Sequence, residues 1–392
     1  MQPNAALEAA ELIAERPDER LDTARLEPYL RAHLPGAEGP LSVAQFHGGK
    51  ANLTYLLRFG VGESTREFVL RRPPLGPIPP GAHDMRREHR VLSALSRRYR
   101  LAPQSLLLCE DESILGAIFI VEERRVGFVI RDDLPAEFAG RPELNRRIGF
   151  ALVDALADLH SVDPRQIGLG DLGRAEGFLT RQLSGWTRRW EASLGGPEEE
   201  ESRAEMAPVL EWLSRTLPRE RAGALLHNDY RLDNCLLDTA DPGRIVAVLD
   251  WDMCTQGDPL ADLGYMLNYW VEPGDAPEWR AIASMPTWRD GFPSRAEAIA
   301  RYSERTGSDV GDVLWYQVFA AFKLAVIIQQ IYIRFVRGQT QDRRFATYAT
   351  RVLGLARKAQ RLIGDCVVIS RAGGNLGLPG LERFPGPPLS RG

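Results

Sequence analysis

Residues 227–234 read HNDYRLDN, and residues 248–252 read VLDWD. The first stretch spaces His227, Asp229 and Asn234 as H-x-D-x-x-x-x-N, and Asp250 follows 16 residues after Asn234. Transfer of a phosphoryl group to a hydroxyl needs a carboxylate beside that hydroxyl and oxygen ligands for Mg²⁺ on the phosphates. Asp229 suits the first task, and Asn234 and Asp250 offer the oxygen ligands that Mg²⁺ prefers. We expect His227 to brace the loop through a hydrogen bond.

Upstream of this motif, the chain predicts a small antiparallel sheet with one helix. The strand-like stretches LSVAQF (41–46) and LTYLLRF (53–59) flank HGGKAN (47–52), which favours a hairpin. REFVLRR (66–72) predicts a third strand, which ends before two prolines, and residues 105–123 supply two more. Residues 85–99 have the apolar spacing of an amphipathic helix.

After Gly127 the pattern changes to long helices. They are predicted over residues 142–160, 178–190, 203–217, 294–306 and 312–337. The sequence therefore predicts an N-terminal lobe over residues 1–125 and a mainly helical C-terminal lobe over residues 126–392. Polar residues interrupt the apolar run 313–336, so we expect a buried helix there rather than a membrane span.

Composition narrows the classes of partner. The chain has 392 residues, a net charge of −4 and a pI near 6.0, which gives no overall field to hold a nucleic acid. Its N-terminus has no basic region followed by an apolar stretch, so we expect a cytoplasmic protein without a membrane anchor. The oligomeric state is left open. Lysine occurs only at Lys50, Lys323 and Lys358, which limits the lysines available to any mechanism.

The chain resembles the aminoglycoside phosphotransferase and choline kinase family, whose catalytic loop and following aspartate match HNDYRLDN and VLDWD. Further stretches resemble the branch that includes the kinase-like region fused to some acyl-CoA dehydrogenases: FHGGKANLTYLL, FVLRRPPLGPIPPGAHDMRREHRVLSAL, LTRQLSGW and GDPLADLGYML. The resemblance runs from about residue 22 to about residue 360. It implies an α+β, bilobal protein-kinase-like fold that uses ATP and Mg²⁺.

Within that resemblance, the glycine turn falls where the family contacts phosphate. HGGKAN is not a Walker-type P-loop, and adjacent glycines alone favour a plain hairpin. Between the first two strands of a kinase-like lobe, Gly48 and Gly49 would let backbone N–H groups approach the phosphates. Lys50 and Asn52 would add donors there, or else lie on the surface.

The resemblance also assigns three residues of the N-terminal lobe. It places Arg71 where the family's third strand carries a phosphate-binding lysine, and Glu88 as its partner. Arginine binds phosphate with a different geometry from lysine. The alternative for Glu88 is a charge on a solvated helix face. Backbone near Glu123 would bind adenine.

Several polar residues of the C-terminal lobe allow two readings. Asp258 before Pro259 is expected to cap a helix, and Asp262 to brace the catalytic loop. Asp252 either reaches a second Mg²⁺ or faces solvent. Lys323, inside an apolar helix, either pairs with a carboxylate or faces a cleft. Trp186 lines the acceptor pocket with Arg181, or belongs to the core.

The sequence is therefore compatible with three functions. The first is an ATP-dependent kinase that phosphorylates a hydroxyl of a small metabolite, and the resemblance suggests a hydroxyacyl group, such as a CoA thioester. The second is a kinase of aminoglycoside antibiotics, which would need a strongly acidic acceptor pocket. The third is a nucleotide-binding pseudokinase without turnover, because Arg71 replaces the lysine.

Overall fold

The computed structural model describes residues 11–47, 52–76, 81, 83–280 and 282–371, and of residues 366–371 the backbone alone. The chain divides into two compact units. The first unit comprises residues Met1–Ile130, Pro164–Gly170 and Asp233–Cys254, and the second comprises Arg131–Asp163, Asp171–Leu232 and Thr255–Gly392. The lobes predicted over residues 1–125 and 126–392 stay a prediction.

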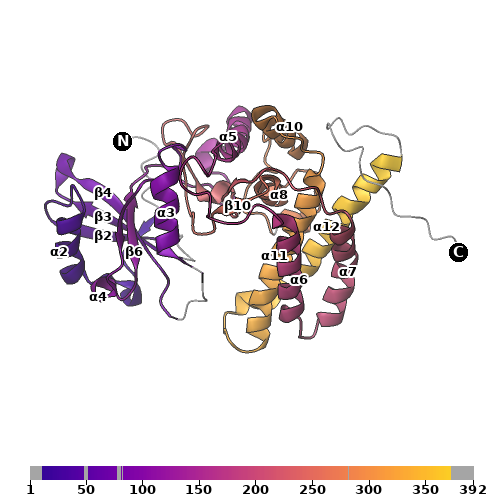
Figure 1. Cartoon of the computed structure of the whole chain (residues 1–392), viewed down its shortest axis with the longest axis horizontal. Coiled ribbons are helices and arrows are strands. Elements are labelled where there is room, and N and C mark those ends of the chain that lie inside the picture. Colours follow the sequence, from indigo (N-terminus) through magenta and orange to yellow (C-terminus); the bar gives the residue numbers. More distant parts are fainter. Residues whose placement is uncertain (1–10, 48–51, 77–80, 82, 281, 372–392) are drawn as a thin grey trace. The chain divides into compact units, whose positions relative to one another are not determined.

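The first unit is built on a six-stranded antiparallel sheet in the order β1-β2-β3-β4-β6-β5 (Figure 1). Its strands are β1 (Leu12–Ile13), β2 (Leu41–Phe46), β3 (Leu53–Phe59), β4 (Arg66–Arg72), β5 (Ser105–Cys109) and β6 (Phe119–Glu123). A second, two-stranded sheet pairs β8 (Cys235–Leu237) with β9 (Ile245–Val248). The predicted hairpin is confirmed, because β2 and β3 pair antiparallel.

Two helices lie on opposite sides of the six-stranded sheet, α2 (Thr23–His33) and α3 (Met85–Leu95) (Figure 1). Leu26 and Leu30 of α2 pack in one core with Tyr55, Leu57 and Leu70 of the strands. Because side chains alternate along a strand, the residues between these core positions point to the other face, toward α3. The short helix α4 (Glu112–Leu115) adds to the α2 side.

The second unit is mainly helical. Its principal helices are α5 (Pro142–His160), α6 (Phe178–Ser193), α7 (Glu199–Arg215), α8 (Leu260–Tyr269), α9 (Pro277–Arg280), α10 (Arg295–Thr306), α11 (Val313–Val336) and α12 (Tyr348–Arg371). One small sheet pairs β7 (Ala224–Leu226) with β10 (Thr255–Gly257). Short 3₁₀ turns complete the two units: Pro17–Glu19, Gly62–Ser64, Ala136–Phe138, Leu232–Asn234 and Arg343–Thr347.

Helix α11 forms the centre of this unit. By length and composition it could cross a membrane, but 67% of its most apolar window is buried in the structure. It packs against α8, where a Cβ on Gly264 would lie 2.5 Å from the Tyr316 Cβ, so only glycine allows this close approach. The prediction of a buried helix is confirmed.

Most predicted helices are present with small shifts at their ends, and Ser294 and Glu297 form a capping box at the start of α10. The elements that were not predicted include β1, β10 and α12 and the short helices α4 and α9. Asp258 accepts a hydrogen bond from the Leu260 N–H at 3.0 Å, which is a capping contact, although the residue next to the helix is Pro259.

Candidate active site

An ion network lies on the α3 face of the six-stranded sheet. Leu70 and Val121 face the opposite core, so their neighbours Arg71 and Glu122 point toward α3. Helix α3 buries Met85, Val91 and Leu95 on the face that also carries Glu88. Alternation in the strands and periodicity in the helix therefore bring one guanidinium and two carboxylates together.

Arg71 contacts three carboxylates. Its Nη2 lies 3.1 Å from Glu88 Oε1 and 2.7 Å from Asp250 Oδ1, and its Nε lies 3.8 Å from Glu122 Oε1. Glu88 is buried, which excludes the alternative of a charge on a solvated helix face. One positive charge opposes three negative ones, so the group carries two excess negative charges when every carboxylate is ionised.

Burial and charge oppose each other in this network. Burial would lower the pKa of the Arg71 guanidinium, but Glu88, Asp250 and Glu122 together raise that pKa above its usual range. Burial raises the pKa of the Glu88 carboxyl to about 8 and that of Glu122 to about 7, and Arg71 only partly offsets this. A single arginine does not keep both buried glutamates ionised.

Asn234 and Asp250 are brought together by the second sheet of the first unit. The Leu249 N–H donates to the Asn234 carbonyl at 2.8 Å, and Cys235 pairs with Val248. Asp250 adopts a left-handed conformation with φ of 68°, which is costly for a residue other than glycine and is found at functional sites. Its side chain is 29% exposed.

The donor set fits Mg²⁺. Within the described residues, no three His, Cys, Asp or Glu side chains gather into a group that could hold a metal alone. A magnesium ion bound with substrate phosphates needs only one or two protein ligands. The excess negative charge favours a divalent cation, and the buried Glu88 Oε2 and Glu122 Oε1 accept no hydrogen bond from the described residues. Asn234 and Asp250 would supply the oxygens.

In the second unit, Asp262 holds the loop that carries Asp229. Its two carboxylate oxygens accept hydrogen bonds from the His227 N–H at 2.6 Å and the Asn228 N–H at 2.8 Å. Burial would raise the pKa of Asp262, but the neighbouring His160 and the His227 N–H lower it below its usual range. The predicted bracing role of Asp262 is confirmed, and Asn228 has a positive φ of 67°.

Asp229 itself is held by two donors. The Tyr265 hydroxyl donates to Asp229 Oδ1 at 2.9 Å, and Arg231 Nη2 donates to Asp229 Oδ2 at 3.5 Å, with Arg231 Nε in ion-pair distance of Oδ1 at 3.2 Å. The Asp229 N–H also lies 3.3 Å from His227 Nδ1, as expected of a bracing histidine. With 26% of its side chain exposed, Asp229 has a fixed orientation and remains accessible to a hydroxyl.

Lys323 contacts the same loop. Its Nζ lies 3.5 Å from the Asn228 carbonyl, 4.9 Å from the Tyr265 ring centre and 5.6 Å from that of Trp186. Among the described residues it forms no ion pair with a carboxylate, so the reading of Lys323 as a buried salt-bridge partner is wrong. Burial lowers the pKa of this amine.

Lys323 instead lines a small hollow of the second unit, which agrees with the alternative of a cleft-facing lysine. The other side chains around it come from α6, α8, α11 and the catalytic loop: Phe178, Gln182, Asn228, Ala261, Asp262, Tyr265, Phe319 and Ala320. Trp186 is 9% exposed and does not line this hollow, and Arg181 donates to the Arg174 carbonyl at 2.5 Å. Both residues therefore have structural contacts.

The other residues predicted to contact the nucleotide are only partly described by the structure. Gly48, Gly49 and Lys50 lie outside the described residues. Asn52 is buried and its Oδ1 lies 2.9 Å from His83 Nδ1, whose ring is also 3.9 Å from Asp252. The Glu123 N–H donates to the Gln104 carbonyl at 2.8 Å. The adenine contact near Glu123 stays a prediction.

Three site residues were not singled out from the sequence, Glu122, Arg231 and Tyr265. Glu122 had a signal, because it is an acid near the end of an apolar strand and faces the same side as Arg71. Arg231 lies two residues after Asp229 and also donates to the Ser284 hydroxyl at 3.2 Å. Tyr265 is 36 positions from Asp229, and only the packing of α8 brings it there.

Residues 42–302 match the Phosphotransferase enzyme family. The chain belongs to this family. It is 33% identical to acyl-CoA dehydrogenase family member 10 of Mus musculus over 81% of this chain, but it spans only 29% of that protein's length. A Ralstonia eutropha protein assigned as an aminoglycoside phosphotransferase is 32% identical, with a TM-score of 0.73 over 88% of this chain and 99% of that one.

A choline kinase of Cryptosporidium parvum has the same fold at 13% identity, with a TM-score of 0.61 over 88% of this chain and 97% of that one. These similarities confirm the predicted α+β, kinase-like fold. The chain is a member of a small-molecule phosphotransferase family whose structural neighbours include kinases of aminoglycosides and choline.

Proposed function

We propose that this phosphotransferase moves the γ-phosphoryl group of ATP to a hydroxyl of a small metabolite, and that the acceptor is a hydroxyacyl group such as a CoA thioester. The proposal rests on the contacts of Asp229 with Tyr265 and Arg231. These contacts orient a carboxylate that remains accessible, on a loop that Asp262 fixes through hydrogen bonds. Such a group is suited to general-base catalysis.

In the proposed reaction, the acceptor oxygen forms a bond to the γ-phosphorus while the bond from that phosphorus to the bridging oxygen of ADP breaks. Asp229 takes the acceptor proton, and ADP leaves with the electron pair of the broken bond. Asn234 and Asp250 would hold Mg²⁺, which neutralises phosphate charge when it is bound. Arg71 offers a guanidinium for phosphate, in competition with its carboxylate partners.

The acyl acceptor rests on relatedness rather than on the hollow beside Lys323. That hollow has a volume of about 20 Å³, enough for about one water molecule, and the Asp262 carboxylate lines it together with the rings of Phe178 and Phe319. The relatedness to proteins named as acyl-CoA dehydrogenase family members points to the acyl class.

An aminoglycoside acceptor is less well supported. A polycationic drug needs a cluster of unengaged acids, and the acidic stretch of this chain is the first turn of α7. There Glu199 pairs with Arg203 at 3.2 Å, Glu201 pairs with Arg357 at 3.2 Å, and the Tyr332 hydroxyl donates to Glu198 at 2.5 Å. These acids stabilise the helix terminus and its neighbours.

One observation favours the second candidate, a nucleotide-binding protein without turnover. Arg71 Nη2 lies 2.7 Å from Asp250 Oδ1, the carboxylate proposed as a metal ligand. If the guanidinium stays paired with this carboxylate, it would oppose the binding of Mg²⁺ there. The two candidates differ in turnover and agree in Mg²⁺-dependent nucleotide binding.

The test is an assay of ADP release with Mg·ATP and a panel of acceptors. Hydroxyacyl-CoA thioesters are compared with the same acyl-CoA thioesters lacking the hydroxyl, and with kanamycin. We expect ADP release only with the hydroxylated thioesters, and its loss in Asp229→Asn. Turnover with kanamycin alone would overturn the acyl assignment, and Mg·ATP binding without turnover on any acceptor would favour the inactive candidate.

A further inference from the structure

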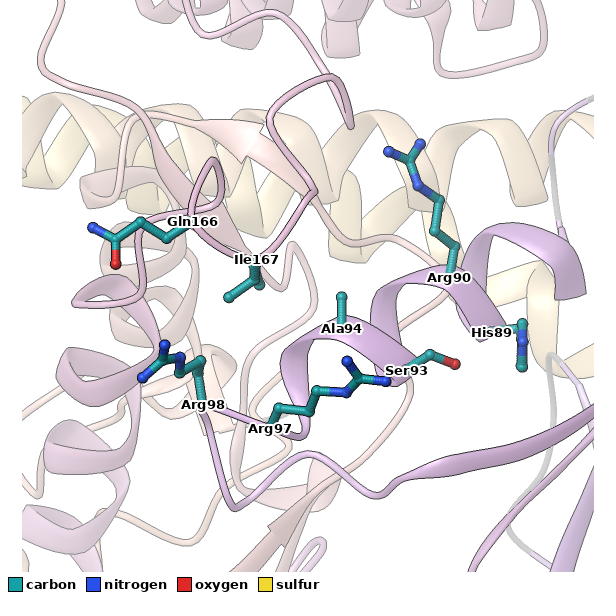
Figure 2. A pocket seen from close by; sticks show the side chains of 8 residues that line it. All are labelled: His89, Arg90, Ser93, Ala94, Arg97, Arg98, Gln166 and Ile167. Atoms are coloured by element: carbon teal, nitrogen blue, oxygen red, sulfur yellow. The ribbon is translucent and has the colours of Figure 1, made fainter.

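The outer face of α3 borders a hollow of about 600 Å³ in the first unit (Figure 2). One wall comes from α3 and the turn after it, and the other from residues 164–170, which belong to the same compact unit. Its lining residues are His89, Arg90, Ser93, Ala94, Arg97, Arg98, Gln166 and Ile167. The volume falls in the usual range of roughly 300–1,000 Å³ for small-molecule sites.

The charge of this hollow is one-sided. Three of its lining residues are arginines and none is acidic. Elsewhere on α3, Arg86 pairs with Glu110 and Glu88 pairs with Arg71. Within the described part of the chain, Arg97 and Arg98 form no ion pair. Surfaces normally mix both signs, and a concave surface of one sign concentrates ions of the opposite sign.

The hollow also has a fixed geometry. Arg90 Nη2 donates to the Gly168 carbonyl at 3.1 Å, which ties the helix to the facing loop. Figure 2 shows Ile167 on that loop across from Ala94, with the guanidinium groups of Arg90 and Arg98 on opposite sides of the two apolar residues. Ligand sites commonly combine apolar surface with a few polar groups, and this lining has both.

We infer that this hollow binds the phosphate group of a small organic phosphate, at a place separate from the proposed metal site. Guanidinium groups present paired N–H donors that match two phosphate oxygens at once, so several of them together favour a dianion. Glu88, Val91 and Leu95 occupy the buried face of α3, whereas Arg90 lies on its exposed face and the two other arginines of the hollow lie exposed in the turn after it. This site goes beyond the proposed kinase reaction.

The test is equilibrium dialysis of the full chain against radiolabelled glycerol 3-phosphate at physiological ionic strength. Mg²⁺ and a non-hydrolysable ATP analogue are present at saturating concentration to occupy a nucleotide site. We expect glycerol 3-phosphate to bind and glycerol, which lacks the phosphate, not to bind. The double variant Arg97→Gln/Arg98→Gln should weaken binding about tenfold or more, since each lost charge-assisted contact contributes strongly.

Two further variants make the result specific. Arg20→Gln/Arg66→Gln removes the same charge from exposed arginines of the first unit outside the hollow and should leave binding unchanged. Ala94→Leu keeps the charge and the helix but fills the hollow, so it should also weaken binding. No binding by the native chain, equal weakening in both double variants, or no effect of Ala94→Leu would each overturn the inference.

Discussion

The two proposed catalytic aspartates have opposite electrostatic surroundings. In the first unit, Asp250 shares one guanidinium with two buried glutamates, so the group is short of positive charge. In the second unit, Asp229 lies 3.2 Å from the Arg231 guanidinium and accepts a hydrogen bond from the neutral hydroxyl of Tyr265. The first carboxylate belongs to a group with more carboxylates than cations, whereas the second lies beside a guanidinium and close enough to Lys323 to interact with its ammonium group.

The difference suggests how each aspartate contributes. A site with excess negative charge favours Mg²⁺, and without Mg²⁺ it favours protons on its carboxyls, as the raised pKa values of Glu88 and Glu122 show. A partly exposed carboxylate with a fixed orientation and a cation beside it is available to take a proton from an alcohol. Substitutions in the two regions should therefore change different measured quantities.

The largest effect is expected for Asp250→Ala. Without this oxygen ligand, Mg²⁺-dependent nucleotide binding should be lost, so Mg·ATP should no longer raise the unfolding temperature. For the native chain, Mg·ATP at a hundredfold excess over its Kd should add about 2.7 kcal/mol to the free energy of unfolding. The measurement is thermal unfolding with and without Mg·ATP, with the exposed Glu63→Ala as a control of the same unit. Normal Mg·ATP stabilisation of Asp250→Ala would show that the metal binds elsewhere.

Asp229→Asn should separate turnover from binding. The amide keeps an acceptor for the Tyr265 hydroxyl but cannot take a proton, so kcat should fall by about 10² to 10⁴. The affinity for Mg·ATP should stay within about a factor of two, because the base acts on the acceptor hydroxyl. Steady-state kinetics and nucleotide titration measure the two quantities. An unchanged kcat would remove Asp229 from the mechanism.

The sequence predicted most of the first unit because its signals are local. Alternation along REFVLRR places Arg71 on the face opposite Leu70, and helical periodicity in MRREHRVL places Glu88 on the buried side of α3. The same alternation could have identified Glu122, whose position in FIVEE matches the Arg71 side. Helix α12 also had a readable signal, with buried Val352, Ala356 and Ala359 at helical spacing.

The donors to Asp229 and the partners of Lys323 depend on tertiary packing instead. Tyr265 reaches the catalytic loop because α8 packs on α11 at Gly264, and nothing local to either sequence specifies that contact. A buried lysine was expected either to pair with a carboxylate or to face a cleft, and Lys323 lines a hollow where it meets a carbonyl and two aromatic faces. A ring face and a carbonyl dipole each stabilise an ammonium group, so charge pairing alone was too narrow a criterion.

A smaller effect concerns the pH dependence of stability. Glu88 and Glu122 have pKa values of about 8 and about 7 in the folded protein, above the usual glutamate value near 4.3. Between these values the folded state binds more protons than the unfolded state, so stability should fall as pH rises from about 5 to about 8. Glu88→Gln removes one of these groups and should flatten the fall, by at most about 1.4 kcal/mol per pH unit.

Urea unfolding at several pH values, without nucleotide, measures this slope. The exposed Glu63→Gln serves as the control and should leave the slope unchanged. The same slope in Glu88→Gln as in the native chain would mean that the buried glutamates stay ionised, and the contrast between the two aspartates would then lose its basis.

The smallest effect is expected for Tyr265→Phe, which tests whether the hydroxyl on Asp229 is a positioning group. The ring and its contact with Lys323 remain, but Asp229 loses a hydrogen bond of 2.9 Å. We expect kcat to fall about tenfold, the equivalent of one hydrogen bond of about 1.4 kcal/mol, with the KM for ATP unchanged. Tyr55→Phe removes another buried hydroxyl, which donates to the Glu19 carbonyl, and should lower stability to a similar extent without changing kcat. If both variants lose stability equally and neither loses kcat, Tyr265 supports only the fold, and Arg231 alone orients the proposed base.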